Sequence, residues 1–261
     1  MAGLLKRRDE LLAGGEWPEL IRQIRARTPA RVLVGRAGAG YRTGTQLDLR
    51  EAHAAARDAV RDELDLSAAL GLDFVGRWEL REFRTRARNK DEYLLRPDLG
   101  RKFDDESSER LSKSEASNCD VQIAIGDGLS VAAVAEQVPH LLPPLFAGMK
   151  ARGWTAGRAF VIRHCRVGIL NEIGELLKPQ VAVLLIGERP GLATATSLSA
   201  YMAFRPTKAH TDADRNLISN IHARGVGTEE AAERILELAA QMMHAKVSGC
   251  RLREQTRGLI K

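Results

Sequence analysis

Three short loops carry the residues that could do chemistry, and each follows an apolar run rich in Val and Ile. The first is IGDGLS at 125–130, where two glycines permit a tight turn and a close backbone approach to a ligand. The second is HCRVG at 164–168. The third is GERPGL at 187–192, where Glu188 offers a hydrogen-bond acceptor and Arg189 a fork-shaped donor. Considered singly, each loop is also consistent with a surface turn whose side chains are solvated.

The catalytic signatures that these residues suggest are all incomplete. Val131 stands where the dinucleotide-binding pattern GxGxxG requires its third glycine. Tyr41 and Arg42 replace the Lys and the Ser or Thr of a phosphate-binding loop. The six histidines lack the spacing of metal ligands, and Cys165 has no identifiable base. The sequence therefore predicts binding loops and no self-contained catalytic centre.

Strands alternating with helices must position these loops. Apolar runs of strand length lie at 120–126, 159–165, 181–187 and 197–205, and helical patterns lie at 130–138, 140–152, 170–177, 213–223 and 229–247. This alternation predicts an α/β fold, a doubly wound and mainly parallel sheet covered on both faces. Ligands bind beyond the carboxyl ends of such strands, where the three loops occur.

The composition changes along the chain and suggests three segments. Residues 1–45 form an Arg- and Gly-rich extension with a short helical pattern at 19–27. Residues 46–105 are interpreted as helical, with an amphipathic helix at 49–66 and a helical or irregular stretch at 78–88. A polar stretch containing Pro97 and Gly100 predicts a boundary, and residues 106–261 form the α/β domain with a trailing C-terminal end.

Composition also limits the class of protein. Hydrophobic residues make up 44% and charged residues 28%, which is typical of a globular protein. No apolar stretch is long enough to span a membrane, and charges follow the N-terminus too early for a signal peptide, so a cytoplasmic location is expected. The cysteines are expected to be reduced thiols, since they are three in number and far apart. Despite a net charge of +6, acidic residues follow each arginine cluster and aromatic residues are only 5%, so no nucleic-acid partner is expected.

Taken together, five motifs are specific. In chain order they are RPDLGR at 96–101, IGDGLS at 125–130, IGELL at 173–177, LIGERPGL at 185–192 and ADRNLISNIH at 213–222. In this order and at this spacing, the chain from about Thr28 to Leu252 resembles the small (light) subunit of ethanolamine ammonia-lyase.

The resemblance implies an adenosylcobalamin-dependent lyase that converts ethanolamine to acetaldehyde and ammonia by a radical route. A large TIM-barrel subunit would hold the substrate, and this chain would form a Rossmann-like domain with an N-terminal helical extension that covers cobalamin at the interface. The segment 46–105 would contact the large subunit. Six large–small pairs are implied, in the cytoplasm or in a bacterial microcompartment, with no membrane partner.

The family's cobalamin contacts fall on Val167 and Glu188, and a third, a cysteine in the family, falls on Leu217. A thiol role is therefore excluded there, while a packing contact could survive. Two other classes of protein stay open from the residues alone. One is a nucleotide-binding enzyme that uses Gly126–Gly128 as its phosphate loop, and the other is a basic module that binds nucleic acid. Stabilisation by NAD, FAD or ATP would favour the first, and salt-dependent binding to DNA or RNA the second.

Overall fold

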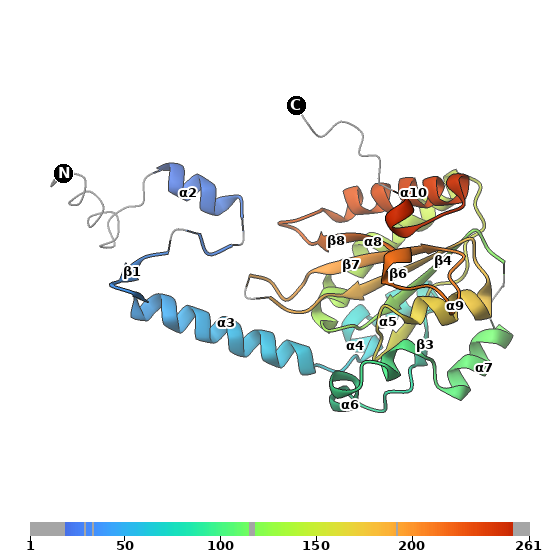
Figure 1. Ribbon diagram of the computed structural model, residues 1–261, viewed down its shortest axis with the longest axis horizontal. Coiled ribbons are helices and arrows are strands. Elements are labelled where there is room, and N and C mark those ends of the chain that lie inside the picture. Colours follow the sequence, from blue (N-terminus) through green and yellow to red (C-terminus); the bar gives the residue numbers. More distant parts are fainter. Residues whose placement is uncertain (1–18, 29, 33, 115–117, 192, 253–261) are drawn as a thin grey trace. The chain divides into compact units, whose positions relative to one another are not determined.

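The computed structural model describes residues 19–28, 30–32, 34–114, 118–191 and 193–252 (Figure 1). The chain divides into two compact units, Met1–Asp58 with Gly191–Thr194, and Ala59–Pro190 with Ala195–Lys261. The predictions about a signal peptide and a trailing end concern residues 1–18 and 253–261, which lie outside the described residues. Among the helices of the described part, none combines the length and the apolar character that crossing a membrane requires.

The first unit is built from short elements and one long helix. They are α2 (Glu19–Ala26), the antiparallel pair β1 (Arg36–Ala37) and β2 (Gly40–Tyr41), and α3 (Thr43–Arg61), which continues into the second unit. The short helix predicted at 19–27 is confirmed, and the helix predicted at 49–66 begins and ends earlier. No α3 side chain is fully buried. The apolar positions Leu49, Ala52, Ala56 and Val60 of this helix are therefore only partly buried.

The second unit contains a six-stranded mixed sheet in the order β3-β5-β4-β6-β7-β8. Its first four strands are parallel, whereas β7 and β8 are antiparallel to their neighbours. The α/β class and the four predicted strands are confirmed. The sheet adds one strand at each edge that the sequence did not predict. The strands are β3 (Arg81–Arg84), β4 (Val121–Gly126), β5 (Phe160–Arg163), β6 (Val181–Gly187), β7 (Leu198–Phe204) and β8 (Asn216–Ile221).

The two added strands correct two predictions. β3 lies in the stretch interpreted as helical or irregular, and it pairs with β5 over all four residues. β8 lies where a helix was predicted at 213–223. Its buried residues Ile218 and Ile221 are three apart, yet they pair with Ala200 and Leu198 of β7, which are two apart. The register shift in this pair therefore gives β8 a three-residue apolar spacing, which is also the spacing of a helix face.

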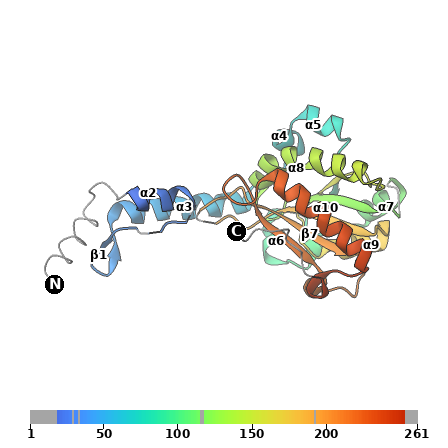
Figure 2. The same ribbon diagram turned by 90° about the horizontal axis from the view of Figure 1, so that it is seen from above.

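Helices cover both faces of the sheet (Figure 2). One face is covered by α8 (Val131–Ala151) and α10 (Thr228–Ala245), and the other by α7 (Asp105–Ser114) and α9 (Ile169–Leu177). The predicted helices at 170–177 and 229–247 are confirmed. The helical stretches predicted at 130–138 and 140–152 are confirmed, but they form one helix, because α8 runs through Pro139, Pro143 and Pro144. Each interior proline costs about 3 kcal/mol, and burial of one α8 face against the sheet offsets that cost.

Three short helices complete the second unit and lead into its sheet. They are α4 (Leu66–Leu70), α5 (Leu72–Arg77) and α6 (Lys90–Leu95). The Asp65 side chain caps α4 by accepting from the Ala68 N–H, and Asn89 caps α6 by accepting from the Glu92 N–H. Such caps satisfy N–H groups that have no partner inside the helix. The cap at Asn89 fixes where α6 starts, and with it the position of Lys90 and Tyr93.

Candidate functional site

The candidate site lies at the carboxyl ends of the three central parallel strands. In the sheet, β4 lies between β5 and β6, so the connection after β4 leads to one side and the connection after β5 returns to the other. This reversal leaves a crevice beyond the strand ends. A hollow of about 300 Å³ lies there, which we call the Glu188 hollow. It is lined by Tyr93, Gly128, Leu129, Arg166, Val167, Ile186, Gly187, Glu188, Arg189, Ser199, Tyr201 and Leu217.

The structure brings all three sequence-predicted site residues into this hollow. Val167 follows β5 and packs partly against the core, Glu188 is the first residue after β6, and Leu217 lies on β8 with 45% of its surface exposed. Leu217 reaches the hollow because β8 is a strand paired with β7, where it lies opposite Tyr201. The location of Leu217 was therefore predicted from the resemblance and not from the helix expected there.

Glu188 is held across three strands. Its Oε2 accepts a hydrogen bond from Ser197 Oγ at 2.8 Å, and its Oε1 accepts from Ser199 Oγ and from the Asn220 N–H, the latter at 3.3 Å. Its own N–H donates to the Ser197 carbonyl at 3.0 Å. A carboxylate has about four acceptor positions, so one position remains for a further donor. Glu188 is thus an oriented acceptor at the edge of the hollow.

Tyr201 adds a phenol to the same wall. Partial burial raises its pKa, and the negative charges of Glu188 and Asp212 raise it further, with Arg215 acting in the opposite direction. A tyrosine hydroxyl is protonated at neutral pH even at its ordinary pKa, and the shift is in the same direction, so Tyr201 can donate a hydrogen bond there. Together with Val167 and Leu217, the ring makes this side of the hollow largely apolar.

Tyr93 and Arg166 support the loop that carries Val167. Arg166 lies in the HCRVG loop that the sequence predicted as a binding loop, whereas Tyr93 was not predicted. The Arg166 guanidinium lies 4.1 Å from the centre of the Tyr93 ring, and its Nη2 donates to the Tyr93 carbonyl at 3.2 Å. The Tyr93 hydroxyl donates to the Cys165 carbonyl at 3.0 Å, and Tyr93 itself is buried. This contact joins α6 to the loop after β5 and fixes the backbone just before Val167.

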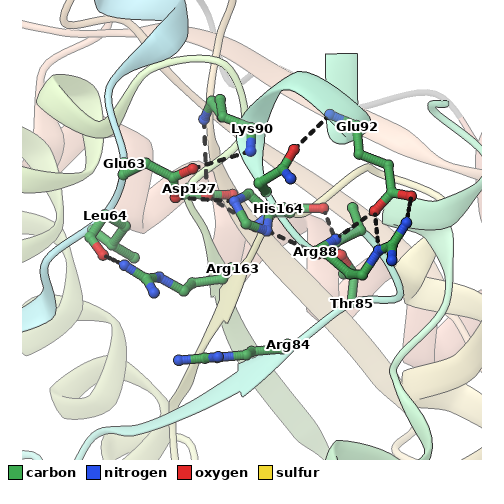
Figure 3. Close-up of polar contacts among 12 residues, drawn as sticks. Glu63, Leu64, Arg84, Thr85, Arg88, Lys90, Glu92, Asp127, Arg163 and His164 are labelled. Atoms are coloured by element: carbon green, nitrogen blue, oxygen red, sulfur yellow. Dashed lines mark hydrogen bonds and ion pairs between the residues drawn. The ribbon is translucent and has the colours of Figure 1, made fainter. Parts of the chain in front are cut away.

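Asp127 closes the loop after β4 (Figure 3). Its side chain is completely buried and accepts from the backbone N–H groups of His164 and Cys165, each at 2.9 Å. Lys90 Nζ lies 3.9 Å from the same carboxylate and donates to the Gly128 carbonyl at 3.1 Å. The N–H groups that hold this side chain belong to the loop after β5. In the loop after β4 itself, the Asp127 N–H donates to the Ile162 carbonyl at 3.2 Å and the Leu129 N–H to the Gly187 carbonyl at 3.0 Å, so these two donors are not free to bind a phosphate.

The glycine after Asp127 gives a second reason why this loop is not a phosphate loop. Gly128 has φ +57°, and a Cβ there would lie 2.3 Å from the Gly187 carbonyl oxygen. The loop therefore packs directly against the end of β6. Together, the engaged N–H groups of the loop and this close approach argue against the nucleotide-binding interpretation of Gly126–Gly128.

His164 extends the same network toward the segment that follows α3. Its Nδ1 lies 3.0 Å from the Ala87 carbonyl, and its Nε2 lies 3.0 Å from Glu63 Oε2 (Figure 3). Burial alone would raise the pKa of Glu63, but the hydrogen bonds from His164 and the Lys90 N–H lower it overall, together with the charges of His164 and Arg163. These contacts fix the loops next to the hollow. His164 lies in the predicted HCRVG loop, whereas Glu63 and Lys90 were not predicted.

Known proteins resemble the chain over most of its length. The sequence model of the family described as ethanolamine ammonia-lyase light chain matches residues 18–253. The ethanolamine ammonia-lyase small subunit of Clostridioides difficile is 39% identical over 95% of this chain and 82% of its own length. Those of Clostridium perfringens and Clostridium acetobutylicum are 41% and 37% identical, over 88% and 90% of this chain and 76% and 95% of their own lengths.

Proposed function

We propose that this chain, which belongs to the ethanolamine ammonia-lyase light chain family, covers adenosylcobalamin at the interface with a large catalytic subunit. The two-subunit enzyme would convert ethanolamine to acetaldehyde and ammonia by a radical route. The observation that carries this proposal is the convergence of Val167, Glu188 and Leu217 on one hollow. They come from three different loops or strands, so their meeting is not a consequence of sequence proximity.

The chemistry of the Glu188 hollow fits the edge of a corrin ring. Corrins carry peripheral carboxamides, whose N–H groups need acceptors, and apolar ring edges between them. Glu188 keeps one acceptor position for such an N–H, while Val167 and Leu217 offer apolar contact. Adenosylcobalamin would supply the radical chemistry, and the side chains of this chain would orient it and exclude water.

The size of the hollow indicates how much of the cofactor each subunit would hold. At about 300 Å³ it lies at the lower limit for small-molecule sites and accommodates only an edge of a corrinoid. The large subunit would therefore hold the rest of the cofactor together with the substrate. No residue of this chain is proposed to be catalytic.

The first unit is proposed to contribute contact with the large subunit. Its helix α3 leaves no side chain fully buried, and Ile24, Tyr41 and Leu47 are exposed. These side chains lie on α2, β2 and α3, and the large subunit would cover them. The domain boundary near residue 105, the assembly of six pairs, the Rossmann-like character and the location in cytoplasm or microcompartment remain predictions.

A reconstitution experiment tests the proposed function directly. The full chain is mixed with its large subunit and adenosylcobalamin, and ethanolamine-dependent acetaldehyde formation is followed. Each chain alone serves as the control. Activity only in the mixture is expected. If the two chains associate and bind the cofactor but form no acetaldehyde, the result would contradict the assigned reaction.

Glu188→Ala tests the role of the hollow in that complex. We expect its dissociation constant for adenosylcobalamin to rise about tenfold, equivalent to about 1.4 kcal/mol, while the chain stays folded. Glu233→Ala is the matched control, because Glu233 is an exposed carboxylate on α10 outside the hollow. Equal affinity in wild type and Glu188→Ala would refute the assignment of the hollow to the cofactor.

A further inference from the structure

A second, larger pocket of about 680 Å³ lies next to the Glu188 hollow, and we call it the Arg215 pocket. The two cavities lie near each other, since Val167 lines the hollow and the next residue, Gly168, lines the pocket. Cations dominate the lining, with five Lys or Arg residues against the two carboxylates of Glu172 and Asp212. The cationic residues are Arg86, Arg101, Lys102, Lys208 and Arg215.

Arg215 places a buried, incompletely paired guanidinium in the pocket wall. Only 5% of its side chain is exposed; Nη1 pairs with Asp212 and Nη2 donates to Asn171 Oδ1 at 3.0 Å. Its Nε is buried without a hydrogen-bond partner among the described residues, and so is Nδ1 of His210, which also lines the pocket. Buried polar atoms usually have partners, so two such atoms in one pocket point to a ligand.

Three further cations of the lining form no ion pair among the described residues. Within the described part of the chain, no carboxylate lies within ion-pair distance of the side chains of Arg101, Lys102 or Lys208. The stem of Arg101 packs over Gly168, where a Cβ would lie 2.8 Å from Arg101 Cγ. α9 begins directly after Gly168, so the positive end of its dipole adds to the same field.

Charge repulsion is already present in the pocket. Burial lowers the pKa of Arg215, Asp212 raises it, and the positive charge of Arg101 lowers it. An anion between the two guanidinium groups would reverse that unfavourable interaction. Guanidinium groups bind phosphate oxygens with paired, charge-assisted hydrogen bonds, and the surrounding lysines suit a group with several oxygens.

We propose that the Arg215 pocket binds a phosphate group. Two sources present this chemistry, free phosphate and the phosphodiester that links the nucleotide to the corrin in cobalamin. The second source rests on the proposed function, because it requires the corrin edge to occupy the adjoining Glu188 hollow. The first source does not depend on it.

The test uses the full chain and inorganic phosphate in calorimetric titrations at constant ionic strength set with chloride. The variant Arg101→Gln/Lys208→Gln removes two exposed charges of the pocket. The matched control Arg77→Gln/Lys150→Gln removes two exposed charges of the same unit outside it. We expect saturable binding by wild type and control, and at least tenfold weaker binding by the pocket variant. No saturable binding by wild type, or equal weakening in both variants, would overturn the proposal.

A second arm identifies the source, with the assembled complex and two corrinoids. Adenosylcobinamide lacks the phosphodiester that adenosylcobalamin carries. If the cofactor supplies the phosphate, the pocket variant binds adenosylcobalamin at least fivefold more weakly than wild type does. Its affinity for adenosylcobinamide then equals that of wild type. If free phosphate is the ligand, the pocket variant binds both corrinoids like wild type while its phosphate binding is still lost. Failure of the proposed function is seen separately, as unchanged corrinoid affinity in Glu188→Ala.

Discussion

Two carboxylates in nearly identical local sequences occupy opposite roles. Asp127 follows Ile125-Gly126 at the end of β4, and Glu188 follows Ile186-Gly187 at the end of the neighbouring strand β6. Asp127 is fully buried and accepts from two backbone N–H groups, whereas Glu188 is half-buried and lines the hollow. Strand-end position alone therefore does not separate a structural carboxylate from one available to a ligand.

The residues that surround each carboxylate make the difference. The left-handed turn at Gly128 folds the loop against Gly187, and buried Lys90 lies beside the Asp127 carboxylate. Glu188 instead accepts hydrogen bonds from the hydroxyl of Ser199 on β7, from that of Ser197 just before β7, and from the Asn220 N–H on β8. Exposure and the source of the donors, and not charge, distinguish the two sites.

The largest expected effect comes from Asp127→Ala. Removing this carboxylate leaves Lys90 with an uncompensated buried charge and two backbone N–H groups without acceptors, which costs about 3 to 5 kcal/mol. Glu188→Ala is the comparison, with a loss of about 1 kcal/mol, since water can reach its donors in the open hollow. Urea unfolding of both variants measures the difference. Equal losses would show that the two carboxylates do not differ in structural role.

Gly128→Ala tests the turn that closes the Asp127 loop. Positive φ at a non-glycine residue costs about 1 to 3 kcal/mol, and the clash with the Gly187 carbonyl adds to it, so we expect about 3 kcal/mol in total. Gly153→Ala is the matched control, because Gly153 has φ +70° with nothing within 4 Å of its added Cβ. Its loss should be about 1 kcal/mol. Similar losses in both would mean that the close approach to Gly187 contributes nothing.

The sequence predicted β4, β6 and β7 well because they are mostly apolar runs of strand length, with Gln122 and Ser199 the polar side chains inside them. It also predicted the loops that meet at their carboxyl ends, Glu188 among them. It could not predict β8, since the bulge gives its buried residues a helical spacing. Nor could it predict the burial of Asp127, because His164 and Lys90, the residues that decide it, are 37 positions away on each side.

Ser199→Ala sharpens the account of Glu188. It removes one hydroxyl that donates to Oε1 and leaves the donors Ser197 and Asn220 in place. We expect a loss of stability below about 1 kcal/mol and adenosylcobalamin binding about threefold weaker in the complex, because the carboxylate is less well oriented. Ser112→Ala, at an exposed position on α7, is the control. Unchanged cofactor affinity would mean that Glu188 needs no orientation by Ser199.

The smallest effect is expected at Glu63, a partly exposed carboxylate attached to the Asp127 network through His164. Because its pKa is lowered from 4.5 in the folded state, its stabilising contribution is present above that value and is lost as pH falls through the folded pKa. Solvent screening keeps it within about 1 kcal/mol. The free energies of unfolding of wild type and Glu63→Gln should therefore differ near pH 7 and converge in acid. A constant difference across this range would mean that Glu63 stabilises the fold by packing and not by its charge. Convergence would show a small charge contribution, as expected for a partly exposed carboxylate such as Glu188 and unlike the buried Asp127.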